Sequence, residues 1–317
     1  MVQKLLKPLL IMGGGAGLAA APVVLSEYAL GFMVSVMSYV TLATAWAMFS
    51  GPTRYISLAT VAFYGTGAYT VAVLSETLPY PLVLLTALAI GVVLAAFVGM
   101  ATLRLAGIYF VVFSFGLAEL VRQLITWFEV NVTGTLGRYI FLPFETQHIY
   151  WQLLALAGFT IGLGAWIRRT RLGLAPKVIG DDEVVAAHSG IALARTKVML
   201  FVVSAALMTL AGAIQSPRWV YIEPGIVFNP TVSFLTVIMA LLGGAGRLWG
   251  PTLGVIPLMV LFEWLSANFP DHFSILLGAL FILIVFLLPN GVLSALEGWM
   301  KSAKGQSNGK TIEEAQT

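Results

Sequence analysis

The chain has 317 residues, of which 59% are hydrophobic and only 10% are charged, and its formal net charge is +3. Soluble domains carry about 25% charged residues, so this composition excludes an ordinary water-soluble protein. The absence of cysteine excludes disulfides, thiolate metal sites and cysteine nucleophiles. The sequence therefore predicts a membrane protein, and the small net charge gives no reason to expect nucleic-acid binding.

Ten apolar stretches approach the roughly 20 residues that a helix needs to cross a bilayer. The third contains Gly65 and Gly67, and a glycine-rich segment separates the short eighth and ninth, so we expect re-entrant or broken helices there. The predicted fold is an all-α, polytopic bundle of about ten transmembrane helices, some short or broken. The stretches are 9–25, 28–49, 56–75, 79–101, 107–127, 149–167, 198–216, 230–243, 251–267 and 273–289.

The basic residues indicate how the bundle is oriented. With the N-terminus in the cytoplasm, 14 of the 17 Lys and Arg fall inside, and only Arg122, Arg138 and Arg218 fall outside. The positive-inside rule therefore places both termini in the cytoplasm, with the loop 168–197 inside and the loop 128–148 outside. The inside residues are Lys4, Lys7, Arg54, Arg104, Arg168, Arg169, Arg171, Lys177, Arg195, Lys197, Arg247, Lys301, Lys304 and Lys310.

Residues 1–299 are predicted to form one transmembrane domain, and the polar, Gly/Ser-rich segment 300–317 a disordered cytoplasmic tail. The first apolar stretch, preceded by two lysines, also fits a cleaved signal peptide. Segment 305–311 has three residues between its glycines where a phosphate-binding loop needs four, so we expect no ATP hydrolysis by this chain. The three His residues are scattered, and no cofactor or metal site is predicted.

Few charges lie within the predicted spans. Glu119 and Arg122 are three residues apart, near the outer end of the predicted span 107–127. That spacing permits an ion pair on one helix face. Charges inside a membrane are also candidates for a functional role, so both interpretations stay open.

The loop 168–197 has the most distinctive pattern. Three acids, Asp181, Asp182 and Glu183, precede an Ala/Val-rich stretch, and acids favour the start of a helix because they complement its dipole. Gly190 follows where a glycine typically ends a helix. The sequence predicts a short helix between two spans on the cytoplasmic face, although an ordinary solvated loop helix would show the same pattern.

This loop resembles the coupling loop of ATP-binding-cassette (ABC) importer permeases, in the form found in branched-chain amino acid importers. Four further segments resemble that family in the same order along the chain: 57–69, 103–110, 204–213 and 241–251. Among the departures, Arg54 stands where the family commonly has glycine. The residues that match the coupling loop are Gly180, Asp181, Asp182, Glu183, Ala186, Ala187, Gly190 and Ile191.

The resemblance implies a permease subunit, not itself an enzyme, in the inner membrane of a bacterium. It also implies a second related permease, two cytoplasmic ATPase subunits and a periplasmic solute-binding protein as partners. The expected solute is a branched-chain or other hydrophobic amino acid, with urea and short amides as alternatives inside the family. A stand-alone secondary transporter is the alternative of a different class, but no convincing buried carboxylate for ion coupling is evident near mid-membrane.

Residues that line the solute path are expected in two aromatic and glycine-containing segments that match the family. Plain helix packing is the alternative explanation for the same residues. The predicted path residues are Tyr64, Gly65, Gly67, Tyr69, Gly107, Tyr109 and Phe110.

Overall fold

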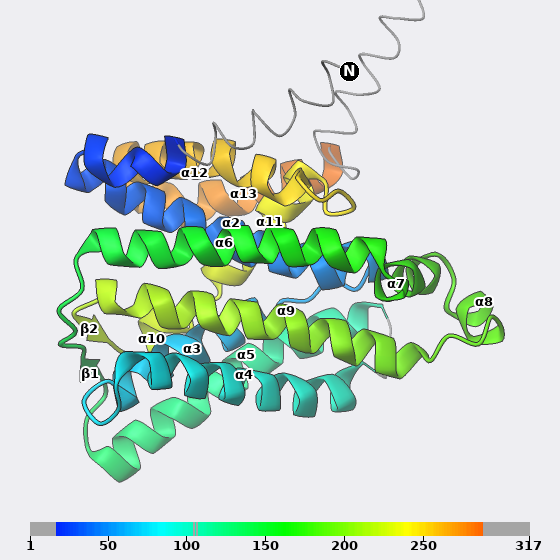
Figure 1. Cartoon of the computed structure of the whole chain (residues 1–317), viewed down its shortest axis with the longest axis horizontal. Coiled ribbons are helices and arrows are strands. Elements are labelled where there is room, and N and C mark those ends of the chain that lie inside the picture. The colour runs from blue at the N-terminus through cyan, green and yellow to red at the C-terminus, as the bar shows by residue number, and fades with distance from the viewer. Residues whose placement is uncertain (1–16, 104, 106, 288–317) are drawn as a thin grey trace, which may run out of the picture.

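A computed structural model of the chain describes residues 17–103, 105 and 107–287. Its long helices lie side by side along one axis, and shorter elements gather at the two ends of the bundle (Figure 1). The described helices of 13 or more residues are α2 (Glu27–Thr53), α3 (Thr60–Leu74), α4 (Tyr80–Thr102), α5 (Ile108–Phe128), α6 (Thr146–Arg169), α9 (Leu193–Gln215), α11 (Thr231–Gly243), α12 (Gly250–Asn268) and α13 (Phe273–Leu287).

Seven helices in the described part of the chain are long and apolar enough to cross a membrane, and two shorter apolar helices accompany them. The predicted helical membrane fold is therefore confirmed, with a helix number close to the expected one. Of the first predicted span, 9–25, only the end is described, and residues 17–24 are helical. The predicted tail 300–317 lies outside the described residues.

The third span differs from its prediction, because α3 continues without interruption through Gly65 and Gly67. These glycines permit close packing instead of breaking the helix. A Cβ atom on Gly67 would lie 1.9 Å from the carbonyl oxygen of Thr209 in α9, and one on Gly65 would lie 2.4 Å from the Phe228 ring. The expected irregularity lies earlier, in the non-helical segment 54–59.

Side chains from other elements satisfy the backbone of that irregular segment. The indole of Trp46 donates a hydrogen bond to the Ser57 carbonyl oxygen (2.7 Å), and the Leu58 amide donates to Ser114 (2.9 Å). The Ser233 hydroxyl accepts from the amide of Val61 (2.9 Å) and donates to the carbonyl of Leu58 (2.8 Å). Non-helical backbone next to a membrane span is tolerated where protein groups satisfy it in this way.

The predicted break between the eighth and ninth spans is confirmed, since α11 ends at Gly243 and α12 begins at Gly250. Cβ atoms on Gly243 and Gly254 would lie 1.7 Å from the Gly250 carbonyl oxygen and 2.1 Å from that of Met239. The two helices therefore form a tight hairpin that only glycine permits.

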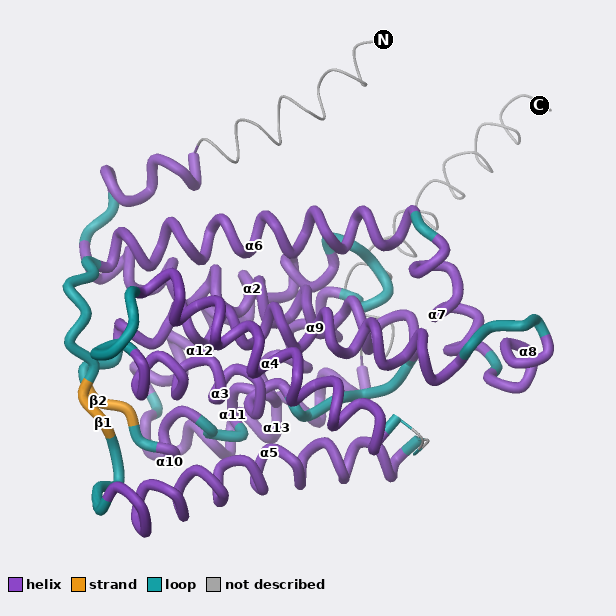
Figure 2. The backbone as a smooth tube through the Cα atoms, turned by 60° about the horizontal axis from the view of Figure 1, so that its bottom comes forward, coloured by secondary structure: helices purple, strands orange, loops and turns teal. Residues whose placement is uncertain are grey.

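The two ends of the bundle are built differently. At one end β1 (Arg138–Tyr139) pairs antiparallel with β2 (Tyr221–Ile222), next to the short helices η1 (Glu129–Thr133), η2 (Ser216–Arg218) and α10 (Pro224–Val227). At the other end α7 (Arg171–Asp181) and α8 (Glu183–His188) project from the bundle (Figure 2). The remaining short helix is η3 (Pro270–His272), between α12 and α13.

Candidate functional site

The predicted short helix after the acidic residues is present as α8, and both of its ends are capped. The Asp182 carboxylate accepts hydrogen bonds from the amides of Val184 (2.7 Å) and Val185 (3.1 Å), which satisfies donors that a helix N-terminus leaves free. Glu183 lies in the first turn, where a negative charge complements the helix dipole. Asp181 instead ends the preceding helix, α7.

At the C-terminus of α8, Gly190 has a φ of 78°, in the left-handed region that favours glycine. Its amide donates to the Ala187 carbonyl (3.0 Å), and the Ile191 amide donates to that of Ala186 (3.1 Å). This pair of bonds is the Schellman arrangement that ends many helices. The predicted helix end at Gly190 is therefore confirmed.

The sequence did not predict α7, because Gly173, Pro176 and Gly180 are poor helix formers. Packing against neighbouring helices explains why the segment is helical. A Cβ on Gly180 would lie 2.2 Å from the Pro52 carbonyl oxygen, so the end of α7 contacts the backbone at the end of α2. The connection from α6 to α9 is consequently two successive helices held against the bundle.

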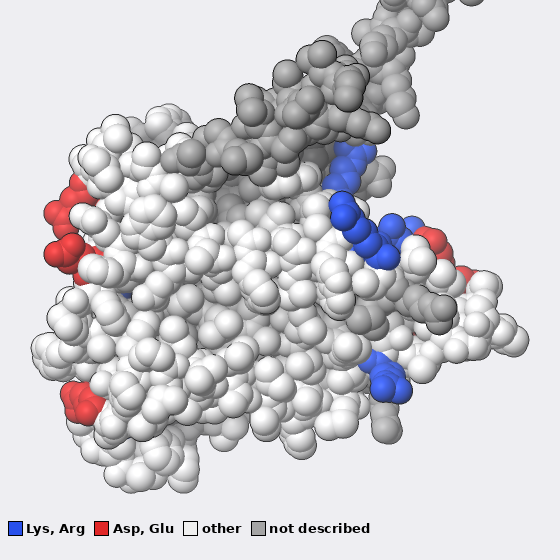
Figure 3. All heavy atoms as spheres, viewed as in Figure 1, with Lys and Arg blue, Asp and Glu red and all other residues white. Residues whose placement is uncertain are grey.

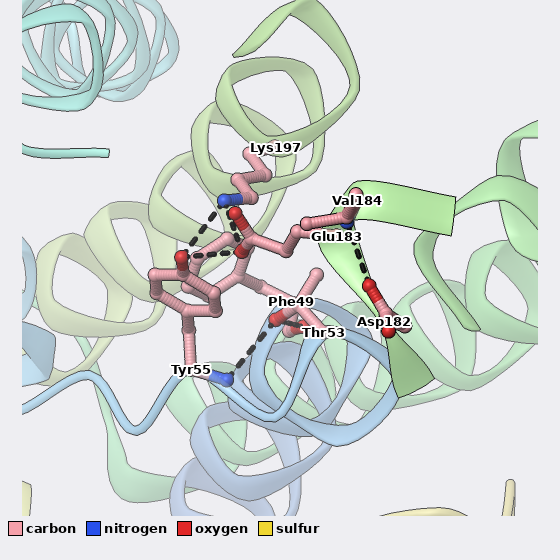
Figure 4. A network of polar contacts seen from close by, with 7 residues as sticks. All are labelled: Phe49, Thr53, Tyr55, Asp182, Glu183, Val184 and Lys197. Carbon is pink, nitrogen blue, oxygen red and sulfur yellow. Dashed lines mark hydrogen bonds and ion pairs between the residues drawn. The ribbon is translucent and has the colours of Figure 1, made fainter. Parts of the chain in front are cut away.

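A cluster of three side chains joins the start of α8 to the bundle (Figure 4). A carboxylate oxygen of Glu183 lies 2.6 Å from the Lys197 ammonium, and the Tyr55 hydroxyl donates to the same oxygen at 2.5 Å. Lys197 also donates to the Tyr55 oxygen (2.8 Å), and its ammonium lies 4.3 Å from the centre of the Tyr55 ring. The Lys197 side chain is only 4% exposed, so this charge depends on its partners.

These contacts shift the pKa values of Glu183 and Tyr55, which lie outside the membrane-spanning helices. Burial alone would raise the pKa of Glu183, but the hydrogen bonds from Lys197 and Tyr55 outweigh it and hold that pKa below its usual value. Burial and then the hydrogen bond to Glu183 raise the pKa of Tyr55. At neutral pH the cluster therefore contains a carboxylate and a neutral phenol.

A second, exposed contact ties α7 to the end of α2. Arg54 lies 2.8 Å from a carboxylate oxygen of Asp181, and both side chains are largely exposed. Arg54 has a φ of 60°, in the left-handed region that favours glycine, the residue that the family resemblance led us to expect there. This contact holds Arg54 beside α7, at the α7–α8 end of the bundle.

The outward face of α8 is apolar. Val184 and Val185 are 64% and 55% exposed to solvent, whereas Ala186 is completely buried against the bundle. An exposed pair of valines on a rigid, capped helix outside the bundle is a surface suited to contact with another protein.

The predicted path residues fall into separate places. Tyr64 lines a cavity of about 440 Å³ together with Tyr39, Gln215, Arg218 and Trp219. The glycines at 65 and 67 instead permit the close helix contacts described above. Tyr69 is also buried in α3, where it packs in a separate apolar cluster.

The second group of predicted path residues lies near the α7–α8 end. Gly107 has a φ of 58° and borders a hollow formed with Arg54, Tyr55 and residues 179–183. Phe110 is buried against the Tyr55 ring, with 5.3 Å between ring centres, whereas Tyr109 is exposed on α5. The structure thus does not bring Tyr64 together with the residues at 107–110.

Tyr55 and Lys197 were missed as site residues, and Lys197 entered the sequence analysis only as a positive charge. Tyr55 is 128 residues from Glu183 and 142 from Lys197 in the sequence. Lys197 directly precedes the predicted span 198–216, so no signal in the sequence indicated that this lysine is buried.

Comparisons with known proteins agree with this architecture. The family of permease components of branched-chain amino acid transport systems matches residues 28–285. The high-affinity branched-chain amino acid transport system permease protein LivM of Escherichia coli is 26% identical over 328 residues, covering 92% of this chain and 76% of that protein. The permease protein LivH of the same organism is 30% identical over 155 residues, 48% of each chain. No solved structure matches the chain.

Proposed function

The chain belongs to the family of permease components of branched-chain amino acid transport systems, and we propose that it pairs with a second, related permease to form one solute path. Relatives named LivM and LivH, two permease proteins of one organism with the same transport description, support a pair of unlike permeases. The solute class is a branched-chain or other hydrophobic amino acid. ATP hydrolysis then belongs to two separate ATPase subunits, and solute capture to a periplasmic binding protein.

The observation that carries this proposal is α8 itself. It is a six-residue helix outside the bundle, capped at both ends, with two exposed valines and an ion pair that ties it to α9. An element that receives movement from a partner must be rigid and must be attached to the helices that move. We propose that the ATPase subunits contact α8 through Val184 and Val185.

The helix α9 connects this element to the cavity around Tyr64. Lys197 lies in its second turn, and a Cβ on Gly212 would lie 1.9 Å from the Tyr64 carbonyl oxygen. The two residues are 15 positions apart, which corresponds to about 22 Å of helix. Packed helices move as rigid bodies, so a displacement of α8 would shift α9 and with it the wall of this cavity.

The charge distribution supports an orientation with α7 and α8 in the cytoplasm. Lys and Arg gather at the α7–α8 end of the visible face, whereas Asp and Glu occur at both ends (Figure 3). Cytoplasmic ends of membrane proteins carry the excess of basic residues. In the proposed orientation, the paired strands β1 and β2 lie on the periplasmic side of a bacterial inner membrane.

Co-purification of the ATPase subunits tests the proposal. In the assembled transporter, V184D/V185D should reduce the recovered ATPase, because two charges replace the apolar contact. V220D is the matched control, since Val220 is 63% exposed at the opposite end of the bundle. Normal recovery with V184D/V185D, or equal loss with V220D, would contradict the proposal.

A further inference from the structure

Helix α5 carries three polar side chains near the middle of a helical segment that is long enough to cross a membrane. Arg122 Nε lies 2.9 Å from Glu119, a second guanidinium nitrogen contacts the other carboxylate oxygen, and the Gln123 amide donates to that same oxygen (2.9 Å). The sequence placed this pair near the outer end of its span. In the structure the apolar helical segment extends over 26 residues, Ile108–Thr133, and Glu119 is its twelfth residue.

This cluster lies on an exposed surface. Of the seven spans in the described residues, Ile108–Thr133 is the least buried, and α5 follows one edge of the bundle (Figure 2). The side chains of Glu119 and Arg122 are 42% and 31% exposed. Charged groups inside a membrane almost always face a bundle interior or a water-filled cavity, so we expect this face of α5 to contact protein or water and not lipid.

Helix α4 has an exposed surface of the apolar kind that contact with lipid requires. It has no charged residue, and its exposed side chains include Leu85, Val93, Phe97 and Met100. The apolar side of α5 is similar, with Leu120 and Leu124 exposed. A helix turns by about 100° per residue, so Gln123 and Leu124 share one depth but point in different directions.

The Glu119–Arg122 pair also has unused hydrogen-bonding capacity. A guanidinium has five donors, of which a carboxylate engages two, and a carboxylate accepts more bonds than this pair supplies. Lipid tails satisfy none of these groups. A solute with one ammonium and one carboxylate group offers a partner for each charge. Because Glu119 and Arg122 already pair with each other, the solute competes with that pair, and its binding stays weak enough for release.

We infer that Glu119, Arg122 and Gln123 line the aqueous solute path where this chain meets the second permease, and that Glu119 and Arg122 contact the ammonium and carboxylate groups of an amino acid in transit. This inference rests on the proposed function and names the part of α5 that recognises the zwitterion. It adds three residues from the middle of α5 to the path residues expected from the sequence, of which Tyr109 and Phe110 lie in the first turn of that helix.

Single cysteines in the assembled transporter test the exposure of this face, because the chain has no native cysteine. A charged, membrane-impermeant thiosulfonate reagent should label Q123C, and saturating solute should slow that labelling. L124C is the control at the same depth, and F97C is the control on α4. Unlabelled Q123C in a complex whose T135C variant reacts, or equal labelling of Q123C and L124C, would overturn the inference.

A charge-neutral variant separates recognition from a purely structural ion pair. E119Q/R122Q removes both charges together, so a pair that merely neutralises itself would leave uptake normal. We expect uptake to fall at least about ten-fold at low solute, measured on complexes that co-purify with all of their subunits. Wild-type uptake would overturn the inference. If V184D/V185D still releases the ATPases while these α5 tests fail, the proposed function stands and only this inference is lost.

Discussion

The Nζ atom of Lys197 lies 2.6 Å from a carboxylate oxygen of Glu183, and this contact fastens the first turn of α8 to α9. Lys197 is almost completely buried, whereas the Glu183 side chain is 37% exposed. Loss of Glu183 would leave a buried ammonium with Tyr55 as its remaining partner in the cluster. The two residues are therefore expected to be strongly coupled in their effect on stability.

A double-mutant cycle tests that coupling. E183A should destabilise the protein by about 1–3 kcal/mol, less than a fully buried pair would lose because solvent reaches Glu183. Adding K197M removes the stranded charge, so E183A/K197M should be more stable than E183A alone. Thermal unfolding of the purified protein in detergent measures all four species. Strictly additive losses would show that the two groups do not interact.

The same ion pair predicts a dependence on pH. Because the pKa of Glu183 is lowered in the folded protein, its contribution to stability is present above the unfolded pKa of about 4.3 and is lost as pH falls through the folded value. The stability difference between the wild type and E183Q should be constant from about pH 5 to pH 8 and shrink below about pH 4. A difference that grows on acidification would have the wrong sign.

Close approach of α3 and α9 makes Gly67 sensitive to substitution. G67A would place a methyl group against the Thr209 carbonyl and should destabilise the protein by about 1–3 kcal/mol. G158A is the matched control, because a Cβ at this exposed position in α6 meets nothing within 4 Å. Unfolding midpoints of the two variants provide the comparison. Equal midpoints would mean that the helices separate easily at this contact.

How much the sequence predicts depends on how local each feature is. The caps of α8 were predictable because Asp182 and Gly190 act on amides and carbonyls within a few residues of themselves. Glycine within α3 was misjudged, since the same residue type breaks some helices and permits close packing in others. The contact of Lys197 with Tyr55 depends on how three separate elements pack, and neither residue's sequence neighbours encode it.

Strain at the C-terminus of α8 provides a test of coupling that leaves the membrane core intact. G190V should disturb the helix end, because a β-branched residue in the left-handed region costs about 1–2 kcal/mol. G190N is the control, since asparagine tolerates that conformation. In the reconstituted transporter, G190V should lower the stimulation of ATP hydrolysis by the loaded binding protein, and G190N should preserve it. Equal stimulation would mean that the helix end is not part of the coupling element.

Photocrosslinking from α8 tests the central claim most directly, because it asks which protein touches this surface in the cell. A photoreactive amino acid at position 185 is predicted to form an adduct between this chain and an ATPase subunit. The same residue at position 220, exposed at the opposite end of the bundle, is predicted to form none with the ATPase. An ATPase adduct from position 220, or none from position 185 in a transporter that still takes up solute, would contradict the account.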